Sequence, residues 1–234
     1  MGMLEDYFKG KTIIISGMGS GQGTATAKLI EKLGGNVIGL SRNGNPPVGN
    51  HPGISVIKCD VGKQEDLEKL KETLSGTKIH GLVNNAGKWE SATDLLVPPN
   101  KLTDFFMSNV NTQYSTIVII KDIMEKHSSI VNIGASRNLL KVNHAGYSIS
   151  KYAIEEMTRI AASSLRDKMI RVNAVLPGSV SKEDSFQRTF PHEFPHTGNI
   201  SEPLEIANIS AFLLSPFSFA VNGQCITADR GLGL

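Results

Sequence analysis

The sequence predicts an α/β fold, doubly wound, in which a mostly parallel sheet carries helices on both faces. Two observations indicate this class. Short strand-like segments alternate with helical segments along the chain, and the first strand leads directly into a glycine-rich loop and a helix. The 234 residues suit one domain, residues 1–234, and no internal repeat, low-complexity tract or interdomain linker is visible.

The N-terminal segment predicts a strand, a glycine loop and a helix in succession. Residues 12–15 form a β-branched run typical of a buried strand, residues 16–23 read Ser-Gly-Met-Gly-Ser-Gly-Gln-Gly, and residues 24–33 are helical in character up to the Gly34-Gly35 pair. Glycines allow a close approach of the backbone to a pyrophosphate, and the helix N-terminus supplies free N–H groups. A tight turn that binds nothing is the competing interpretation.

The remaining chain continues the alternation. Further strands are expected over residues 36–40, 55–59, 81–83, 129–133 and 171–176, and further helices over residues 64–74, 102–126 and 147–165. Residues 43–53, rich in Pro, Gly and Asn, are expected to form a loop. Ligands of such sheets bind beyond the carboxyl ends of the strands, where the glycine loop, Asp60, Asn85 and the segment after Ile133 fall.

A tyrosine and a lysine four residues apart, Tyr147 and Lys151, form a candidate catalytic pair. Residues at this spacing share one face of a helix, so the ammonium can lie beside the phenol. A positive charge there lowers the pKa of a phenol from its usual value of about 10, which suits proton transfer near neutral pH. The same spacing occurs by chance on ordinary helix faces, so the pair gains weight only together with the glycine loop.

These features give the chain a resemblance to the short-chain dehydrogenase/reductase family over nearly its whole length. The glycine loop is similar to the family's Thr-Gly-x-x-x-Gly-x-Gly pattern, with Ser16 in the Thr position. The other motifs follow in the family's order. The matching residues are Gly17, Gly21 and Gly23; Asn84, Asn85, Ala86 and Gly87; Asn109; Tyr147 and Lys151; Pro177 and Gly178; and, towards the C-terminus, Pro203, Glu205, Ile206, Ala207, Gly223 and Asp229.

The resemblance implies a Rossmann-type fold and hydride transfer between a nicotinamide and a carbonyl or alcohol carbon. It assigns proton transfer to Tyr147, and to Lys151 both the lowering of the Tyr147 pKa and a hold on the nicotinamide ribose. Asn109 would kink its helix and fix a water that leads protons to Lys151, or would merely bend the helix. The cofactor-binding residues that it implies are Gly17, Ser20, Gly21, Gln22, Gly23, Arg42, Asp60, Val61, Asn85, Ala86, Gly87, Tyr147, Lys151, Pro177, Gly178 and Val180.

The end of the second strand favours NADP(H) over NAD(H). An acid in this position hydrogen-bonds the ribose of NAD and repels a 2′-phosphate, but here Ser41 takes its place and Arg42 follows. A guanidinium pairs well with a phosphate. The alternatives are that Arg42 is a solvated loop residue and that Asp60 is only a helix cap.

The end of the fifth strand departs from the family pattern. Ala135 stands where the family's catalytic Ser is expected, and Ser136 follows one residue later. Ser136 is predicted to be the working hydroxyl, because Gly134 permits a shift of the strand end by one residue. Asn138 and His144 are further hydrogen-bond donors that could fill the gap.

The predicted function is that of an NADP(H)-dependent oxidoreductase, a carbonyl reductase or alcohol dehydrogenase, with a 3-oxoacyl compound or another ketone as substrate. A non-catalytic NADP(H)-binding sensor or regulator, and an epimerase or isomerase, are the alternatives. Residues 179–200 are expected to overhang the site as a substrate loop, or to serve only in packing. This loop carries Lys182 in place of a family Thr that reaches the nicotinamide carboxamide, and Phe186, Phe190, Phe194, His192 and His196, with no third ligand for a metal.

Composition sets the remaining expectations. A hydrophobic fraction of 40% is typical of a soluble globular chain, and a net charge of +2 gives no reason to expect a nucleic-acid or membrane partner. No apolar run approaches the ~20 residues of a membrane span. Cys59 and Cys225 are expected to be free thiols in a reducing compartment, the cytoplasm. Apolar residues on the helices 102–126 and 147–165 predict a homo-oligomer, a dimer or a tetramer, unless packing on the sheet uses them all.

Overall fold

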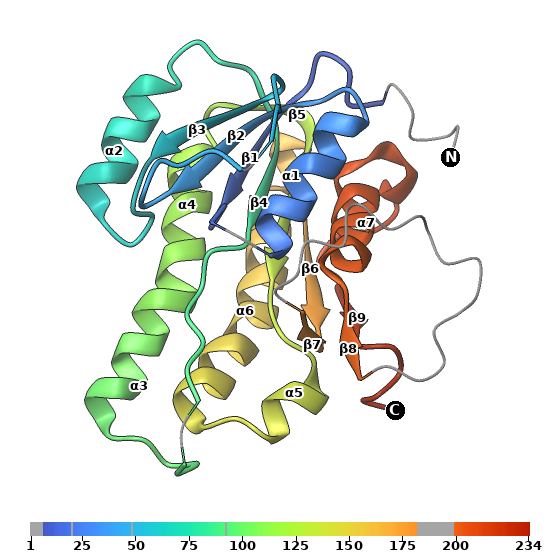
Figure 1. Ribbon diagram of the computed structural model, residues 1–234. Coiled ribbons are helices and arrows are strands. Elements are labelled where there is room, and N and C mark those ends of the chain that lie inside the picture. Colours follow the sequence, from blue (N-terminus) through green and yellow to red (C-terminus); the bar gives the residue numbers. More distant parts are fainter. Residues whose placement is uncertain (1–6, 20, 48, 92, 182–198) are drawn as a thin grey trace.

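Parallel strands form the central sheet of the protein, in the order β3-β2-β1-β4-β5-β6-β9 (Figure 1). The computed structural model describes residues 7–19, 21–47, 49–91, 93–181 and 199–234. Within these residues the strands of the sheet are β1 (Thr12–Ser16), β2 (Asn36–Ser41), β3 (Ile54–Lys58), β4 (Ile79–Asn84), β5 (Met124–Ile133), β6 (Arg171–Pro177) and β9 (Cys225–Ala228). The order reverses between β1 and β4, and such a reversal marks the ligand-binding edge of doubly wound sheets.

Helices cover both faces of the sheet (Figure 1). One apolar cluster joins the sheet to α1 (Gln22–Lys32) and α7 (Pro203–Leu214), and a second joins its other face to α2 (Gln64–Thr73), α4 (Thr112–Ile120) and α6 (Ala145–Ser164). The first strand shows why both faces are covered: Ile13 and Ile15 belong to the first cluster and Ile14 to the second. Side chains alternate across a strand, so a run of isoleucines needs apolar partners on both sides. The predicted fold class is confirmed.

The helix expected over residues 102–126 is wrong in its extent and its regularity. The chain forms α3 (Pro99–Phe106), a π-helical turn (Met107–Asn111) and α4, and then leaves the helix after Ile120. Met124 already pairs with Ile79, and the register between β4 and β5 shifts before Ser129 pairs with Gly81. Strand pairing therefore overrides the local helical character of residues 124–126.

Several short elements were not predicted. These are α5 (Arg137–Lys141), the two-stranded pair β7 (Ser179–Val180) and β8 (Ile200–Ser201), and the 3₁₀ turns Arg166–Lys168 and Pro216–Ser218. Segments of two to five residues carry too little periodicity to be recognised in a sequence. α5 lies close to the carboxyl end of β5, the edge at which such sheets bind ligands.

A buried arginine joins β6 to the end of α7. The Arg171 guanidinium donates to the carbonyl oxygens of Leu213, Ser215, Ser218 and Val221 at 2.9–3.2 Å. A buried cation is costly unless such partners satisfy it. The arginine thus ties the strand that ends at Pro177 to the C-terminal part of the fold.

Candidate active site

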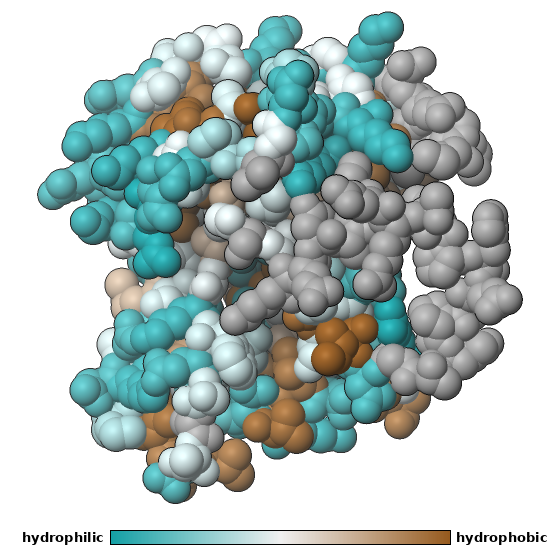
Figure 2. Space-filling model, viewed as in Figure 1, coloured by the Kyte–Doolittle hydropathy of each residue, from teal (hydrophilic) through white to brown (hydrophobic). Residues whose placement is uncertain are grey.

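Two adjoining cavities lie at the carboxyl ends of the strands. The larger, of about 960 Å³, lies beside the glycine loop and the ends of β2 and β3, and the smaller, of about 230 Å³, beside Tyr147 and Lys151. The space-filling view shows a hollow in the surface between the part that carries α2 and the part that carries α3 (Figure 2). The residues that line both cavities are Asn85, Gly87, Lys88 and Trp89. Both cavities therefore lie at the edge of the sheet where the sequence predicts ligand binding.

The glycine loop packs against the segment that follows β4. A Cβ on Gly17 would stand 2.7 Å from the Ala86 Cα, and one on Gly23 would stand 2.7 Å from the Asn85 Nδ2. The Ser16 Oγ accepts the N–H groups of Asn85 and Ala86 at 3.1 Å, and the Asn85 Nδ2 donates to the Gly17 carbonyl at 3.1 Å. These glycines are thus needed for contact between two loops of the protein itself, besides any approach to a ligand.

The N-terminal end of α1 is suited to an anion. Gly21 forms its N-cap at φ 63°, and among the described residues no side chain caps this end and nothing lies within 4 Å of where a Cβ on Gly21 would stand. The first N–H groups of a helix are free to bind when no side chain caps them. The Gln22 Oε1, at the start of the same helix, is buried and has no hydrogen-bond partner in the part of the chain that the structure describes. These observations fit a dinucleotide whose pyrophosphate lies at this end. Ser20, also expected here, lies outside the described residues.

The ends of β2 and β3 bring the predicted cofactor-selecting residues together. Ser41 is buried, with its Oγ accepting the Asn43 N–H at 3.3 Å, and the exposed Arg42 lines the larger cavity beside Asp60 and Val61. The Asp60 Oδ1 accepts the N–H of Gly62 at 3.0 Å, whereas the N-cap of α2 is residue 63, without a side-chain cap. Asp60 therefore shapes the turn at the cavity and does not cap α2.

Tyr147 and Lys151 lie on α6 and line the smaller cavity, each 6% exposed. The Lys151 Nζ donates to the Ile133 carbonyl at 3.0 Å, which the Gln113 Nε2 also reaches at 3.1 Å. Burial raises the pKa of Tyr147 to about 12 and lowers the pKa of Lys151 to about 8. The expectation that Lys151 lowers the Tyr147 pKa is therefore wrong for this structure, because removal of the phenol from water opposes ionisation.

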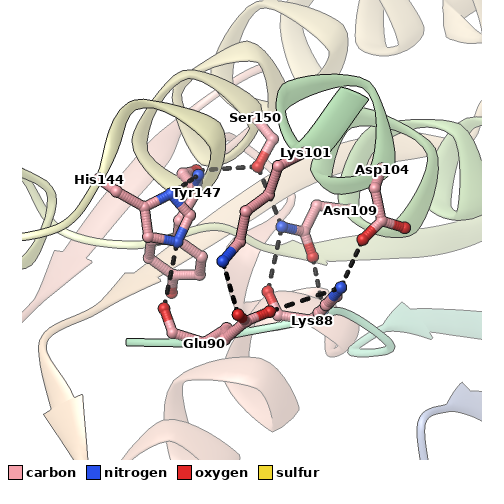
Figure 3. Close-up of polar contacts among 8 residues, drawn as sticks. All are labelled: Lys88, Glu90, Lys101, Asp104, Asn109, His144, Tyr147 and Ser150. Atoms are coloured by element: carbon pink, nitrogen blue, oxygen red, sulfur yellow. Dashed lines mark hydrogen bonds and ion pairs between the residues drawn. The ribbon is translucent and has the colours of Figure 1, made fainter. Parts of the chain in front are cut away.

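Asn109 lies in the π-helical turn between α3 and α4 and is fully buried. Its Oδ1 accepts the Lys88 N–H at 2.7 Å, and its Nδ2 donates to the Lys88 carbonyl at 3.2 Å and to the Ser150 Oγ at 2.9 Å (Figure 3). The expected irregularity of this helix is present as a turn with one extra residue, a feature that often marks functional sites. The turn aims the amide of Asn109 at the loop after β4.

Ala135 and Ser136 have different surroundings at the end of β5. Ala135 packs with Phe105, Leu140 and Tyr147 in a small apolar cluster. Ser136 is fully buried, caps α5 through an Oγ that accepts the Leu139 N–H at 3.4 Å, and is not among the residues that line the smaller cavity. Among the described residues no hydrogen bond joins its hydroxyl to Tyr147, and its Oγ lies 3.9 Å from where a Cβ on Gly178 would stand. Consecutive residues of an extended segment point to opposite sides, and Gly134 introduces no shift that would exchange them.

The two other donors considered for this position are also placed elsewhere. The His144 Nδ1 accepts the Tyr147 N–H at 3.3 Å, and its Nε2 contacts the Glu90 carbonyl at 3.1 Å. The tautomer with hydrogen on Nε2 satisfies both contacts, so neither nitrogen is left for a substrate. Asn138 is half-buried beside Gly233 and is not among the lining residues of the smaller cavity.

The last residue of β6 and the glycine after it line the smaller cavity. Pro177 and Gly178 line it, and a Cβ on Gly178 would stand 2.9 Å from the Asp229 Cβ. Val180 lies in β7, packs on the first apolar cluster and is not among the lining residues. Arg230 forms an ion pair with Glu205. Lys182 and the aromatic and histidine residues of the expected substrate loop lie outside the described residues.

Lys88 and Trp89 line both cavities but were missed in the sequence. They directly follow Asn84-Asn85-Ala86-Gly87, at the carboxyl end of a strand, and this position was the available signal. Within the part of the chain that the structure describes, no group of three metal-binding side chains occurs, and no helix is long and apolar enough to cross a membrane. Cys59 is buried and Cys225 half-buried, both as free thiols.

Comparison with known proteins agrees with this geometry. A family model described as enoyl-(acyl carrier protein) reductase matches residues 17–233. The chain belongs to the short-chain dehydrogenase/reductase family. This family implies a nicotinamide dinucleotide, NAD(H) or NADP(H), as cofactor and a small molecule as substrate.

Similar proteins in the short-chain dehydrogenase/reductase family cover almost the whole chain. Carbonyl reductase family member 4 of Danio rerio is 30% identical over 241 residues, covering 94% of this chain and 97% of its own. The 2,5-dichloro-2,5-cyclohexadiene-1,4-diol dehydrogenase of Sphingobium indicum is 30% identical over 243 residues, covering 95% and 96%. The ligand-free aldohexose dehydrogenase of Thermoplasma acidophilum superposes with a TM-score of 0.82 at 25% identity, covering 98% of this chain and 94% of its own.

Proposed function

We propose that this chain is an NADP(H)-dependent oxidoreductase that interconverts a carbonyl compound and an alcohol. The observation that carries the proposal is the placement of Tyr147 and Lys151 in a small cavity that opens beside the glycine-loop cavity. A dinucleotide held at the N-terminal end of α1 would extend from one cavity towards the other. The names of the relatives, a carbonyl reductase and a diol dehydrogenase, are consistent with this reaction class.

Tyr147 is the proton donor in the reducing direction of the proposed reaction. Because burial raises its pKa to about 12, the phenol stays protonated at neutral pH and can protonate a developing alkoxide. Lys151, fixed by the Ile133 carbonyl, would hold the hydroxyl groups of the nicotinamide ribose. The cofactor supplies or accepts the hydride when bound. Pro177 and Gly178 line the same cavity.

Consumption of NADPH against a panel of aldehydes and ketones, with a 3-oxoacyl thioester among them, tests this function. Turnover of any carbonyl above the no-substrate rate supports it. The placement of Ala135 beside Tyr147 favours one second candidate, a sensor that binds NADP(H) without chemistry. Tight binding of NADPH together with no turnover of any member of the panel would favour the sensor.

The Ala135 position is open to a direct test. We expect Ala135→Ser to raise kcat by about tenfold or more, because a hydroxyl beside Tyr147 adds a donor to the substrate carbonyl, and such donors contribute ~2–4 kcal/mol at the transition state. Ser136→Ala is the matched control. It should leave kcat within about threefold and lower the free energy of unfolding by ~1 kcal/mol, the usual cost of a lost N-cap. A hundredfold loss of kcat in Ser136→Ala would show instead that Ser136 is the working hydroxyl.

The proposed preference for NADP(H) rests on Arg42 and Ser41 at the end of β2. No acid occupies that position, and Lys63 lines the same cavity as Arg42, which adds positive charge where a 2′-phosphate would lie. We expect Arg42→Ala to lower the affinity for NADPH by one to two decades, or ~1.5–3 kcal/mol, and to leave the affinity for NADH unchanged. Calorimetric titrations measure both affinities. Arg137→Ala, an exposed arginine on α5, is the control. Equal affinities of the wild type for the two cofactors would reject the preference.

We also propose a homo-oligomer, a dimer or a tetramer. Several residues expected at the interface are in fact buried in the monomer core, among them Phe105, Ile117, Ile120, Ile154 and Leu165. The outer surface of α3, α4, α6 and the turn between α3 and α4 nevertheless exposes a second set: Phe106, Met107, Tyr114, Val118, Ile149, Tyr152 and Ile160. Apolar exposure on this scale is typical of interfaces.

Light scattering tests the assembly. We expect a mass of at least twice the 25.2 kDa of one chain at micromolar concentration, and a shift towards the monomer in Ile160→Glu, since Ile160 is 62% exposed on α6. Val142→Glu introduces the same charge at a 75% exposed residue outside these helices and should stay oligomeric. A wild-type mass of one chain would remove the proposal.

A further inference from the structure

The backbone of Tyr147 is tied to the loop of residues 88–90 at both of its polar groups (Figure 3). On the N–H side, Tyr147 donates to the His144 Nδ1 at 3.3 Å, and the His144 Nε2 contacts the Glu90 carbonyl at 3.1 Å. On the carbonyl side, the Ser150 Oγ donates to Tyr147 at 2.8 Å and accepts from Asn109. Asn109 in turn holds the backbone N–H and carbonyl of Lys88.

The histidine does more than cap a helix. Asn, Asp, Ser or Thr suffices to accept one N–H at a helix start, and none of these has a second nitrogen that reaches a further carbonyl. His144 is 2% exposed, and its ring packs edge-on against Phe105 with the ring centroids 4.6 Å apart. Phe105 also packs against the Tyr147 ring, at 6.4 Å between centroids. The imidazole therefore has a fixed plane in which one nitrogen faces Tyr147 and the other Glu90.

The loop of residues 88–90, to which these hydrogen bonds lead, lies at the two cavities. Lys88 and Trp89 line both cavities, so a bound cofactor or substrate would contact this loop. The side chains of Lys88 and Glu90 form ion pairs with Asp104 and Lys101. The side chains of these ion pairs are 29–51% exposed, and pairs in contact with solvent contribute little to stability. The buried links through His144 and Asn109 are accordingly the firmer attachments of the loop.

We propose that His144 is a positioning residue that couples the cleft loop 88–90 to the phenol of Tyr147. The inference rests on the proposed reductase function, in which Tyr147 must stay at a fixed distance from the reacting carbonyl. Errors of about 1 Å in such placement cost up to about a hundredfold in rate. The link through His144 sets the start of α6, and hence Tyr147, relative to the loop that contacts the ligands.

Two variants separate this link from simple capping. His144→Asn keeps a side chain that accepts the Tyr147 N–H but is too short to reach the Glu90 carbonyl, and His144→Phe keeps the ring and loses both contacts. Trp89 is the chain's one tryptophan, so quenching of its fluorescence by acrylamide reports on the loop without any turnover. The measurements are kcat, KM and NADPH affinity with the best carbonyl of the panel, the melting temperature, and Trp89 quenching.

In His144→Asn we expect a melting temperature near that of the wild type, kcat lowered about tenfold, KM and NADPH affinity within about twofold, and stronger Trp89 quenching. His144→Phe should show the same losses with a lower melting temperature, because the cap is gone as well. Asn143→Ala is the control, since it removes the 2.9 Å hydrogen bond that the Trp89 Nε1 donates to the Asn143 Oδ1 and leaves His144 in place. Its Trp89 quenching should rise while kcat stays near that of the wild type.

Full retention of kcat in His144→Asn, or unchanged Trp89 quenching in both His144 variants, would overturn the proposal and leave His144 as a helix cap only. Absence of turnover in the wild type would instead reject the reductase function. In that case Trp89 quenching alone still decides whether His144 holds the loop, so the two failures are distinguishable.

Discussion

Tyr147→Phe is expected to lower kcat for carbonyl reduction by two to four decades, which is the usual contribution of a positioned general acid. The substitution removes one oxygen from a side chain that is 6% exposed and keeps the ring that packs against Phe105 and Ala135. The melting temperature and the affinity for NADPH should therefore change little. Steady-state kinetics and calorimetric titration of both proteins measure the difference.

The pH dependence adds a second check on Tyr147. Since its pKa is raised to about 12, the phenol remains protonated throughout the neutral and moderately alkaline range, and reduction should show no loss from its ionisation below about pH 10. A variant Tyr147→Phe with near-normal kcat would show that the proton comes from another group.

Lys151→Met is expected to make the protein more stable near pH 7 while abolishing turnover. Burial lowers the pKa of Lys151 from 10.5 to about 8. The charged form of Lys151 is therefore less favourable in the folded protein than in the unfolded chain. Removing that charge should raise the free energy of unfolding on the order of 2–3 kcal/mol. The Ile133 carbonyl keeps its bond from the Gln113 Nε2, so no acceptor is left unpaired.

The gain from Lys151→Met should depend on pH in a defined direction. Between about pH 8 and pH 10.5 the unfolded chain binds a proton at Lys151 that the folded protein does not, so the wild type gains stability as pH rises. The difference between variant and wild type is then full below pH 8 and vanishes towards pH 10.5. Urea unfolding near pH 7 and near pH 10 measures it, with Lys69→Met on the exposed side of α2 as control. A difference that does not shrink would contradict the assigned pKa direction.

The sheet and the larger cavity follow from short-range patterns. An unbroken isoleucine run at Ile13, Ile14 and Ile15 requires apolar cover on both faces, and that requirement alone predicts helices on each side of a parallel sheet. The glycine loop is predictable because its constraint is local: Gly17 and Gly23 have no room for a Cβ. The placement of Tyr147 and Lys151 on one face of a helix is likewise predictable, because it follows from the helical period alone.

What the sequence does not predict depends on contacts between distant segments. Whether Ala135 or Ser136 faces Tyr147 is decided by how β5 lies against β6, where the Ser136 N–H donates to the Pro177 carbonyl at 2.7 Å. The helix expected to reach residue 126 is ended by pairing with Ile79. The partners of His144 come from residues 54 positions upstream and three positions downstream, and only the second is visible in a sequence.

The four carbonyl groups around Arg171 have a consequence for biosynthesis. A ribosome delivers β6 first, and the acceptors of the guanidinium follow 42 to 50 residues later. Until those residues have left the exit tunnel, docking of β6 would place an unpaired cation in the interior, at a cost of several kcal/mol. Pairing of the strands from β1 to β4 does not bury this cation, so these strands can pair while synthesis continues. We therefore expect folding on the ribosome to be staged, with β6 docking only after residues 213–221 have emerged.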